Sequence, residues 1–226
     1  MRHVIFDFFG TLVTYRDGVH GNPVERTRRT LSAWGVQLTS DELSQRFAGC
    51  FTRLERAASE TLREYSMEDA TRLLFDELGV AASKMRIGQF VGCYLDDWTE
   101  GVQGLPNLAC WLDAFPASKS VLSNTHHEPL VEGLLDGLGI RASFEHVTTS
   151  IAFGLRKPHP SIYLAHLECI GVAARDAVFV GDNAQCDYFG PRASGIESYL
   201  IAPRPVSRVS ERHRLAHLYQ LIERLQ

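Results

Sequence analysis

Residues 4–12 read Val-Ile-Phe-Asp-Phe-Phe-Gly-Thr-Leu, and this stretch decides the fold. The apolar residues before Asp7 are typical of a buried strand, whereas Gly10 and Thr11 favour a turn. A strand that ends in a turn presents the Asp7 carboxylate at the edge of a sheet, where it can act as a nucleophile. Asp7 is therefore the first candidate for a catalytic residue.

Similar apolar runs recur in the second half of the chain. They lie at 119–123, 177–181 and 197–201, with a weaker one at 145–149. Helical patterns separate them, at 104–115, 127–138, 159–170, 185–194 and 207–225. Strands that alternate with helices predict an α/β fold with a doubly wound parallel sheet covered on both faces. Ligands of such sheets bind beyond the carboxyl ends of the strands, which is where the polar residues fall.

The stretch from 15 to 100 breaks this alternation. It contains helical patterns at 22–34, 40–62, 67–79 and 83–98, with no convincing strand between them. Ser40 and Ser66, each followed by acidic residues, are expected N-caps, and Gly35 and Gly79 suit helix ends. We therefore expect two domains. Residues 1–14 and 101–226 form the α/β core, and residues 15–100 form a four-helix domain inserted after the first strand.

Composition excludes several classes of protein. The chain has 226 residues and a net charge of -4, which gives no electrostatic reason to expect nucleic acid or an anionic membrane as partner. Its five cysteines have no C-x-x-C spacing, so we expect reduced thiols instead of a disulfide framework or a zinc site. No apolar run reaches the roughly 18–20 residues that span a bilayer, and no secretory signal opens the sequence. The expected location is the cytoplasm.

Four motifs occur in order along the chain. Asp7 carries the first, Ser123-Asn124 ends the second strand, and Lys157 lies in Arg-Lys-Pro-His-Pro. The fourth, Gly181-Asp182-Asn183-Ala184-Gln185-Cys186-Asp187, follows a strand. Together they resemble the haloacid dehalogenase-like (HAD) hydrolase superfamily across essentially the whole chain. The resemblance implies a Rossmann-like core and a helical cap domain inserted after the first motif.

The resemblance also implies a role for each acidic residue. Asp7 would be the nucleophile and a ligand of Mg2+, and the backbone carbonyl of Phe9 and the carboxylate of Asp182 would complete the protein's share of the metal site. Magnesium is usually held by one or two carboxylates together with substrate phosphate, which fits this set. Asp187 would hold a metal-bound water or form a salt bridge with Lys157.

The substrate would be a small phosphorylated molecule. Lys157 would neutralise charge on the nucleophile and on the transferring phosphoryl group, and Asn124 would orient the same pocket. Hydrogen bonds to the phosphoryl oxygens would come from the hydroxyls of Thr11 and Ser123 and from the backbone amides of the turn. That turn comprises Phe8, Phe9, Gly10 and Thr11.

Phe9 departs from the phosphatase pattern, in which an aspartate at this position protonates the leaving oxygen and then activates water. Phenylalanine can do neither, and general acid–base help is worth about 10²–10⁴ in rate. Dehalogenases of the superfamily resemble this chain here, because they carry an aromatic residue and their halide leaving group needs no proton. Phosphonate-cleaving members use a cap lysine, but the sequence between 13 and 100 has only Lys84, at the far end of the cap.

The fourth motif points the other way. Metal-independent dehalogenases generally carry serine in place of the first acid, whereas this chain has both Asp182 and Asp187. Clustered carboxylates repel one another, so a cation is a natural reason to place them together. We therefore favour a magnesium-dependent phosphatase. A metal-independent 2-haloacid dehalogenase is the alternative, and a catalytically degenerate protein that binds a ligand or partner is the third reading.

A phosphatase without the second aspartate needs another source of the proton, or none. His126 and His127 follow the second motif and are candidates for lining the pocket. Tyr15, Asp17 and His20 lie where the chain passes into the cap, and a closing cap could bring one of them in. A substrate with a good leaving group, such as an acyl or aryl phosphate, would need no acid.

Overall fold

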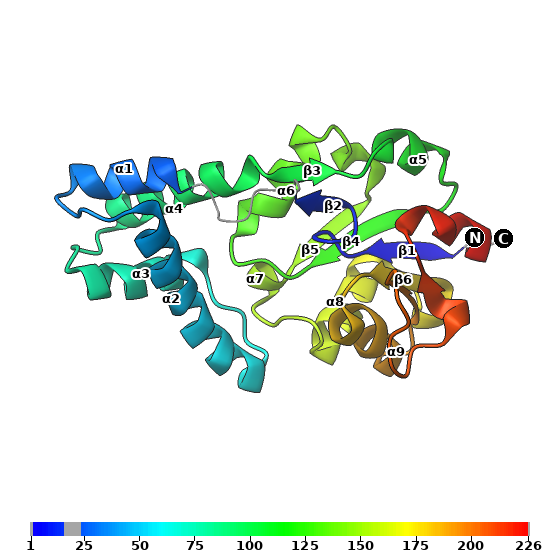
Figure 1. Ribbon diagram of the computed structural model, residues 1–226. Coiled ribbons are helices and arrows are strands. Elements are labelled where there is room, and N and C mark those ends of the chain that lie inside the picture. The colour runs from blue at the N-terminus through cyan, green and yellow to red at the C-terminus, as the bar shows by residue number, and fades with distance from the viewer. Residues whose placement is uncertain (1, 16–23, 226) are drawn as a thin grey trace. The chain divides into compact units, whose positions relative to one another are not determined.

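The computed structural model describes residues 2–15 and 24–225. The chain divides into two compact units (Figure 1). Residues 1–14 and 104–226 form the first unit, and residues 15–103 form the second. Two short strands, β2 (Val13–Tyr15) and β3 (Val102–Gly104), pair with each other where the chain leaves and re-enters the first unit.

The first unit is built on a six-stranded sheet with the order β5-β4-β1-β6-β7-β8. Its strands are β1 (His3–Phe6), β4 (Lys119–Ser123), β5 (His146–Thr149), β6 (Ala177–Gly181), β7 (Glu197–Ile201) and β8 (Arg214–Leu215). Every neighbouring pair is parallel. This confirms the predicted fold class. Because β1 lies between β4 and β6, the segments that follow these three strands meet at one edge of the sheet.

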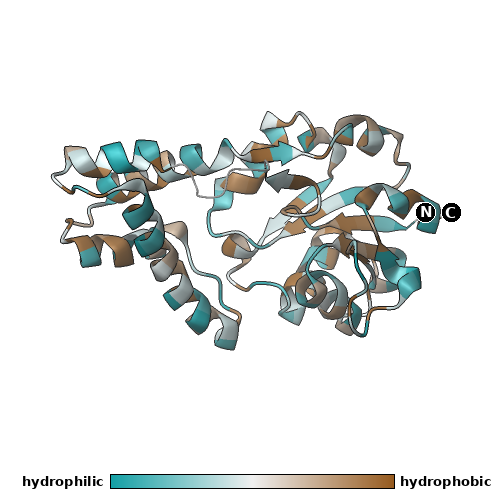
Figure 2. Cartoon of the chain, viewed as in Figure 1, coloured by the Kyte–Doolittle hydropathy of each residue, from teal (hydrophilic) through white to brown (hydrophobic). Residues whose placement is uncertain are grey.

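Helices cover both faces of this sheet. Figure 1 shows α5 (Leu108–Ala114) and α6 (Glu128–Gly137) on one face, and α8 (Pro160–Ile170) and α9 (Gly190–Ala193) on the other. Successive side chains of a strand point to opposite faces. Accordingly Ile5 packs in a cluster with residues of α8, whereas the Phe6 ring meets Trp111 of α5 edge-on. Figure 2 shows the resulting hydrophobic strands between more polar helices.

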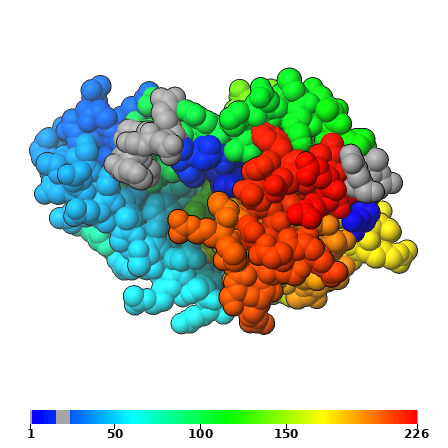
Figure 3. Space-filling view, turned by 45° about the vertical axis from the view of Figure 1, so that its right-hand side comes forward, coloured from blue at the N-terminus to red at the C-terminus, as the bar shows by residue number. Residues whose placement is uncertain are grey.

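The C-terminal segment differs from the prediction of a helix over 207–225. The structure has two single turns of 3-10 helix, the strand β8, and one short helix, α10 (Leu221–Leu225). Here β8 adds a sixth strand to the sheet beside β7, which satisfies backbone groups that a helix would have bonded internally. The segment then packs on α5: the Tyr219 ring lies 5.4 Å from that of Trp111, and the two regions lie side by side in Figure 3.

Two other predicted helices of the first unit are shorter than expected. Residue 104 ends β3 and residues 106–107 form a turn with Asn107 in the left-handed conformation, so that α5 starts only at Leu108. Residues 185–194 consist of a π-helix, Ala184–Phe189, followed by α9. The one-turn helix α7 (Ser150–Phe153) was not predicted from the sequence.

The second unit contains four helices among the residues described. They are α1 (Glu25–Ala33), α2 (Ser40–Thr61), α3 (Met67–Leu78) and α4 (Lys84–Thr99). Their shared core is rich in aromatic rings, and Phe47 meets both Phe90 and Tyr94 edge-on. That this unit acts as a cap over the active site stays a prediction.

The structure corrects one predicted helix cap in this unit. Thr39, and not Ser40, is the N-cap of α2, because Glu42 at the third helical position bonds back to the Thr39 backbone and completes a capping box. Ser66 caps α3 as predicted, and Gly79 ends it in the left-handed conformation. Asp17, His20 and the first residues of the predicted helix 22–34 lie outside the described residues. Within 2–15 and 24–225, no helix is both long and apolar enough to cross a bilayer.

Candidate active site

Asp7 follows directly after β1, at the carboxyl edge of the sheet. Its backbone N–H donates to the Val180 carbonyl of β6 at 2.9 Å, which extends the ladder by one residue and fixes where the side chain starts. The side chain is almost fully buried, and the Thr11 hydroxyl donates to Asp7 Oδ2 at 3.1 Å. Thr11 therefore orients the carboxylate.

The turn after Asp7 is tight. Gly10 has φ +81°, and a Cβ atom at this position would overlap the Asp182 carboxylate. The N–H of Gly10 donates to the Val13 carbonyl at 2.9 Å, and that of Thr11 donates to the Phe8 carbonyl at 3.3 Å. A phosphoryl oxygen would therefore compete with bonds inside the turn for these two amides. Phe8 is fully buried, whereas Phe9 is only partly buried, so its ring is the accessible one.

Lys157 joins the first and fourth motifs. Its Nζ lies 2.8 Å from Asp7 Oδ1 and 2.7 Å from Asp187 Oδ1, and the side chain is almost completely buried. Burial disfavours the ammonium charge, but the charges and hydrogen bonds of Asp187 and Asp7 outweigh this effect and raise the pKa of Lys157 above its ordinary value. Lys157 is therefore a fixed positive charge beside Asp7. The salt bridge expected between Lys157 and Asp187 is present.

Asn124 holds the backbone of residue 157. Its Nδ2 donates to the Lys157 carbonyl at 3.0 Å, and its Oδ1 accepts the Lys157 N–H at 2.9 Å. This pair of bonds links the end of β4 to a segment 33 residues later in the chain. The amide therefore positions the lysine. Ser123, at the end of β4, is fully buried, and its hydroxyl donates to the neighbouring Asn124 carbonyl at 3.4 Å.

Asp7, Asp182 and Asp187 form a cluster of three carboxylates, each with an oxygen within 4.8 Å of the others. Partial burial and the charge of Asp7 raise the pKa of Asp182 to about 6, although the residue as a whole is exposed to solvent. Burial likewise raises the pKa of Asp187, and Lys157 opposes that rise. One ammonium cannot balance three carboxylates, so the cluster fits a divalent cation with oxygen ligands.

Asn183 supports the fourth motif in a way that the sequence analysis missed. Its side chain accepts the N–H groups of Gln185 and Cys186, both at 3.0 Å, and its own N–H donates to Asp187 Oδ2 at 2.9 Å. An Asn directly before a helical pattern is an N-cap signal, and it could have been used. His126 lies partly buried in the turn after β4, and its role stays a prediction.

Thr125 and Ser150 form a second contact that the sequence did not reveal. The Ser150 hydroxyl accepts the Thr125 N–H at 2.9 Å and donates to the Thr125 carbonyl at 3.2 Å. This bond pair joins the turn after β4 to the first residue of α7. No local pattern predicts it, because the partners are 25 residues apart.

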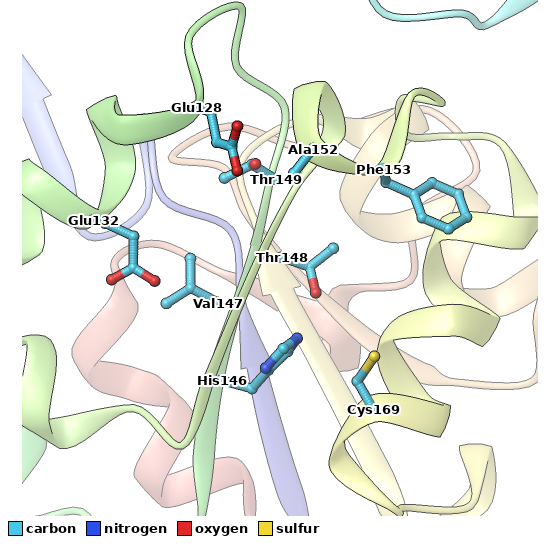
Figure 4. A pocket seen from close by; sticks show the side chains of 9 residues that line it. All are labelled: Glu128, Glu132, His146, Val147, Thr148, Thr149, Ala152, Phe153 and Cys169. Atoms are coloured by element: carbon cyan, nitrogen blue, oxygen red, sulfur yellow. The ribbon is translucent and has the colours of Figure 1, made fainter.

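A groove of about 310 Å³ lies elsewhere on the first unit, along the outer edge of β5 (Figure 4). Val147 points toward Glu132 of α6 on one side of the strand, whereas Thr148 points toward Phe153 and Cys169 on the other. None of the four motif residues Asp7, Lys157, Asp182 and Asp187 lines it. The groove is therefore not the candidate active site.

A strand-end carboxylate, a buried lysine and a second acidic motif thus lie together at one edge of a parallel α/β sheet. A family model described as haloacid dehalogenase-like hydrolase matches residues 1–195. The chain therefore belongs to the haloacid dehalogenase-like hydrolase family, as the sequence motifs indicated.

Two relatives illustrate the similarity. Haloacid dehalogenase-like hydrolase domain-containing protein 3 of Homo sapiens is 44% identical over 117 residues, a match that covers 47% of this chain and 44% of the relative. The chain thus spans less than half the length of this relative. Phosphoglycolate phosphatase of Rhodospirillum rubrum is 27% identical over 211 residues, or 90% of this chain and 82% of that protein.

Solved structures support the fold. A 2-haloacid dehalogenase from Pseudomonas syringae matches with a TM-score of 0.77 at 19% identity, and covers 100% of this chain and 98% of that one. A HAD phosphatase from Thermococcus onnurineus matches with a TM-score of 0.67 at 21% identity, over the same shares of both chains. Dehalogenases and phosphatases are both among the structural neighbours, so the fold alone does not choose between the two reactions.

Proposed function

We propose that the protein is a magnesium-dependent phosphatase that hydrolyses a small phosphorylated metabolite through an aspartyl-phosphate at Asp7. The observation that carries this proposal is the carboxylate cluster around Lys157. Asp7 has one oxygen on Lys157 and the other on Thr11, and Asp182 is close enough to share a cation with it. Asp187 already pairs with Lys157, but a metal-independent reaction gives no reason for Asp182 beside Asp7.

The chemistry follows from these positions. A carboxylate oxygen of Asp7 attacks phosphorus while the leaving oxygen departs with its electron pair, and water then hydrolyses the acyl phosphate and restores Asp7. The Lys157 ammonium stabilises negative charge on the transferring group from a fixed, dehydrated position. Asp7, Asp182 and the Phe9 carbonyl would hold Mg2+, which would supply further positive charge to the phosphoryl oxygens.

Phe9 restricts the substrate. No carboxylate stands at the second position after the nucleophile to protonate the leaving oxygen. We therefore expect a substrate whose leaving group departs without a proton, such as an acyl or aryl phosphate, or an acid supplied by another residue. The helical unit would act as the cap that selects the substrate.

The direct test is steady-state hydrolysis of para-nitrophenyl phosphate with magnesium and again with a chelator, run beside halide release from 2-chloropropionate. We expect phosphate release that the chelator abolishes, and no halide release. Halide release that is insensitive to chelator would instead establish the dehalogenase, which the aromatic Phe9 favours. If neither phosphate nor halide is released, the result would favour a ligand-binding protein.

Asp7→Asn tests the nucleophile. The amide is nearly isosteric but is a poor nucleophile, so we expect phosphate release to fall at least a thousand-fold, on the order of what loss of a covalent nucleophile costs. The Asp176→Asn variant is the matched control, because it makes the same substitution at an exposed carboxylate outside the site. Retention of activity in Asp7→Asn would exclude the aspartyl-phosphate.

A further inference from the structure

In the π-helix that carries Asp187, the carbonyl of Cys186 has no backbone donor at the π-helical spacing. In this segment the Gly190 N–H donates to the Gln185 carbonyl, five residues earlier. The next carbonyl, that of Cys186, would require the N–H of residue 191, but this residue is a proline and has none. A buried carbonyl without a partner is costly, so a donor from elsewhere is needed.

Tyr163 supplies that donor. Its hydroxyl donates to the Cys186 carbonyl at 2.5 Å, from α8 on the same face of the sheet. The side chain is fully buried, and its ring meets Phe179 of β6 edge-on at 5.9 Å. The Phe179 ring also contacts Lys157, whose Nζ lies 5.1 Å from the ring centre. Tyr163 thus contacts both the turn that carries Asp187 and the ring beneath the lysine.

Gly190 leaves room for this hydroxyl. A Cβ atom at position 190 would overlap Tyr163 Oη, and it would come within 3.0 Å of both the Gln185 carbonyl and Pro158. Pro158 follows Lys157 directly in the chain. The residue types at 163, 190 and 191 are therefore matched to one another: proline removes a donor, tyrosine replaces it, and glycine lets the tyrosine approach.

We propose that Tyr163 is a positioning residue, which holds the Asp187 turn against Lys157 through the Cys186 carbonyl and so keeps the ion pair aligned with Asp7. π-helical turns of this kind are rare and occur frequently at functional sites. The inference rests on the proposed phosphatase function only because one of its tests measures kcat for phosphate release. The hydrogen bond and its steric fit with Gly190 belong to the fold itself.

The first test is Tyr163→Phe, which keeps the ring against Phe179 and removes only the hydroxyl. We expect kcat for para-nitrophenyl phosphate to fall by about ten- to one-hundred-fold, as for a small misplacement of reacting groups, with KM changed less than about twofold. The control is Tyr219→Phe, which removes a hydroxyl that also donates to a backbone carbonyl, that of Pro106, at 2.5 Å. We expect this control to keep the wild-type kcat.

The second test uses Gly190→Ala alone and combined with Tyr163→Phe. The Gln185 carbonyl and Pro158 still crowd the Cβ in the double variant. If the alanine acts mainly by displacing the hydroxyl, the losses in kcat and melting temperature of the double variant are nevertheless clearly smaller than the product and the sum of the separate losses. Additive losses in melting temperature would overturn the steric fit, and they are measurable without activity.

The outcomes separate the two proposals. A wild-type enzyme without phosphatase activity would contradict the proposed function and leave the melting-temperature cycle to decide the hydrogen bond. An active wild type whose Tyr163→Phe variant has an unchanged kcat would overturn the positioning role of Tyr163. Equal falls in kcat for Tyr163→Phe and Tyr219→Phe would do the same.

Discussion

At the scale of single residues, the contrast between Lys157 and Phe9 determines what chemistry the site can perform. Lys157 has a raised pKa because Asp187 and Asp7 outweigh its burial, so it remains charged over any ordinary pH range. Phe9 offers no proton at all. The site therefore combines strong stabilisation of negative charge with weak general acid–base catalysis, and this combination suits leaving groups that are already stable anions.

Phe9→Asp tests this contrast directly. A carboxyl group at this position could protonate a leaving alkoxide, so we expect turnover of an alkyl phosphate to rise about 10²-fold or more, while turnover of an aryl phosphate changes less than about fivefold. The measurement is kcat/KM for a matched pair, such as para-nitrophenyl phosphate and a small alkyl phosphate. Phe9→Asn is the control, since asparagine has a size and polarity similar to those of aspartate but no acidic proton. An equal effect on both substrates would mean that residue 9 does not face the leaving group.

At the scale of elements, the turn between β1 and β2 sets how closely the first and fourth motifs approach each other. Gly10 has φ +81°, a conformation that costs most residues about 1 kcal/mol or more, and its missing side chain makes room for Asp182. The cluster of carboxylates thus depends on a backbone position that contributes no functional group of its own.

Gly10→Ala separates these two roles of the glycine. We expect a loss of about 1–2 kcal/mol of unfolding free energy from the positive φ, together with a fall of tenfold or more in activity because Asp182 must move. Gly195→Ala is the matched control: it has the same φ of +81°, but its nearest neighbour would be in ordinary contact at 3.6 Å. Chemical denaturation and kcat measure the two effects. Equal activity losses in both variants would show that strain alone is responsible.

Elements also show what a sequence can and cannot predict. The strand that ends just before Asp7 and the strands that end at Ser123 and Gly181 were predicted, because apolar runs and turn residues are local signals. The helix predicted over 207–225 was wrong, because the pairing of β8 with β7 depends on a distant strand. The bonds from Asn124 to Lys157 and from Tyr163 to Cys186 likewise join segments that are 33 and 23 residues apart, and no periodicity reports them.

At the scale of the whole molecule, the stability of the first unit depends on a buried polar chain through its sheet. His3 of β1 bonds Ser120 of β4, Ser120 bonds His166 of α8, and His166 bonds Thr148 of β5, each at 2.8 Å. His166 is fully buried. Burial, with smaller contributions from His146, His3 and Lys157, lowers the pKa of His166 to about 3. The folded protein therefore keeps this imidazole neutral, and the hydroxyls on either side of it satisfy both ring nitrogens.

The buried histidines of this hydrogen-bonded chain make the stability of the fold dependent on pH. The pKa of His166 is lower in the folded state than its ordinary value of 6.5, so below pH 6.5 the unfolded chain binds a proton that the folded chain does not. The contribution of His166 to stability is thus complete above about pH 6.5 and falls toward pH 3, by about 2–3 kcal/mol between pH 6.5 and 4.5. Burial lowers the pKa of His3 and His213 too, which adds in the same direction. The raised pKa of Asp182 acts in the opposite direction over this range, so the contribution of His166 is measured as a difference between variants. Urea unfolding at a series of pH values measures the slope. His166→Gln should remove this loss of stability on the acid side, while Ser198→Ala, which removes a buried hydroxyl that does not titrate, should keep the slope. If His166→Gln folds poorly, an NMR titration of His166 in the intact protein decides, and protonation near pH 6.5 would contradict the argument.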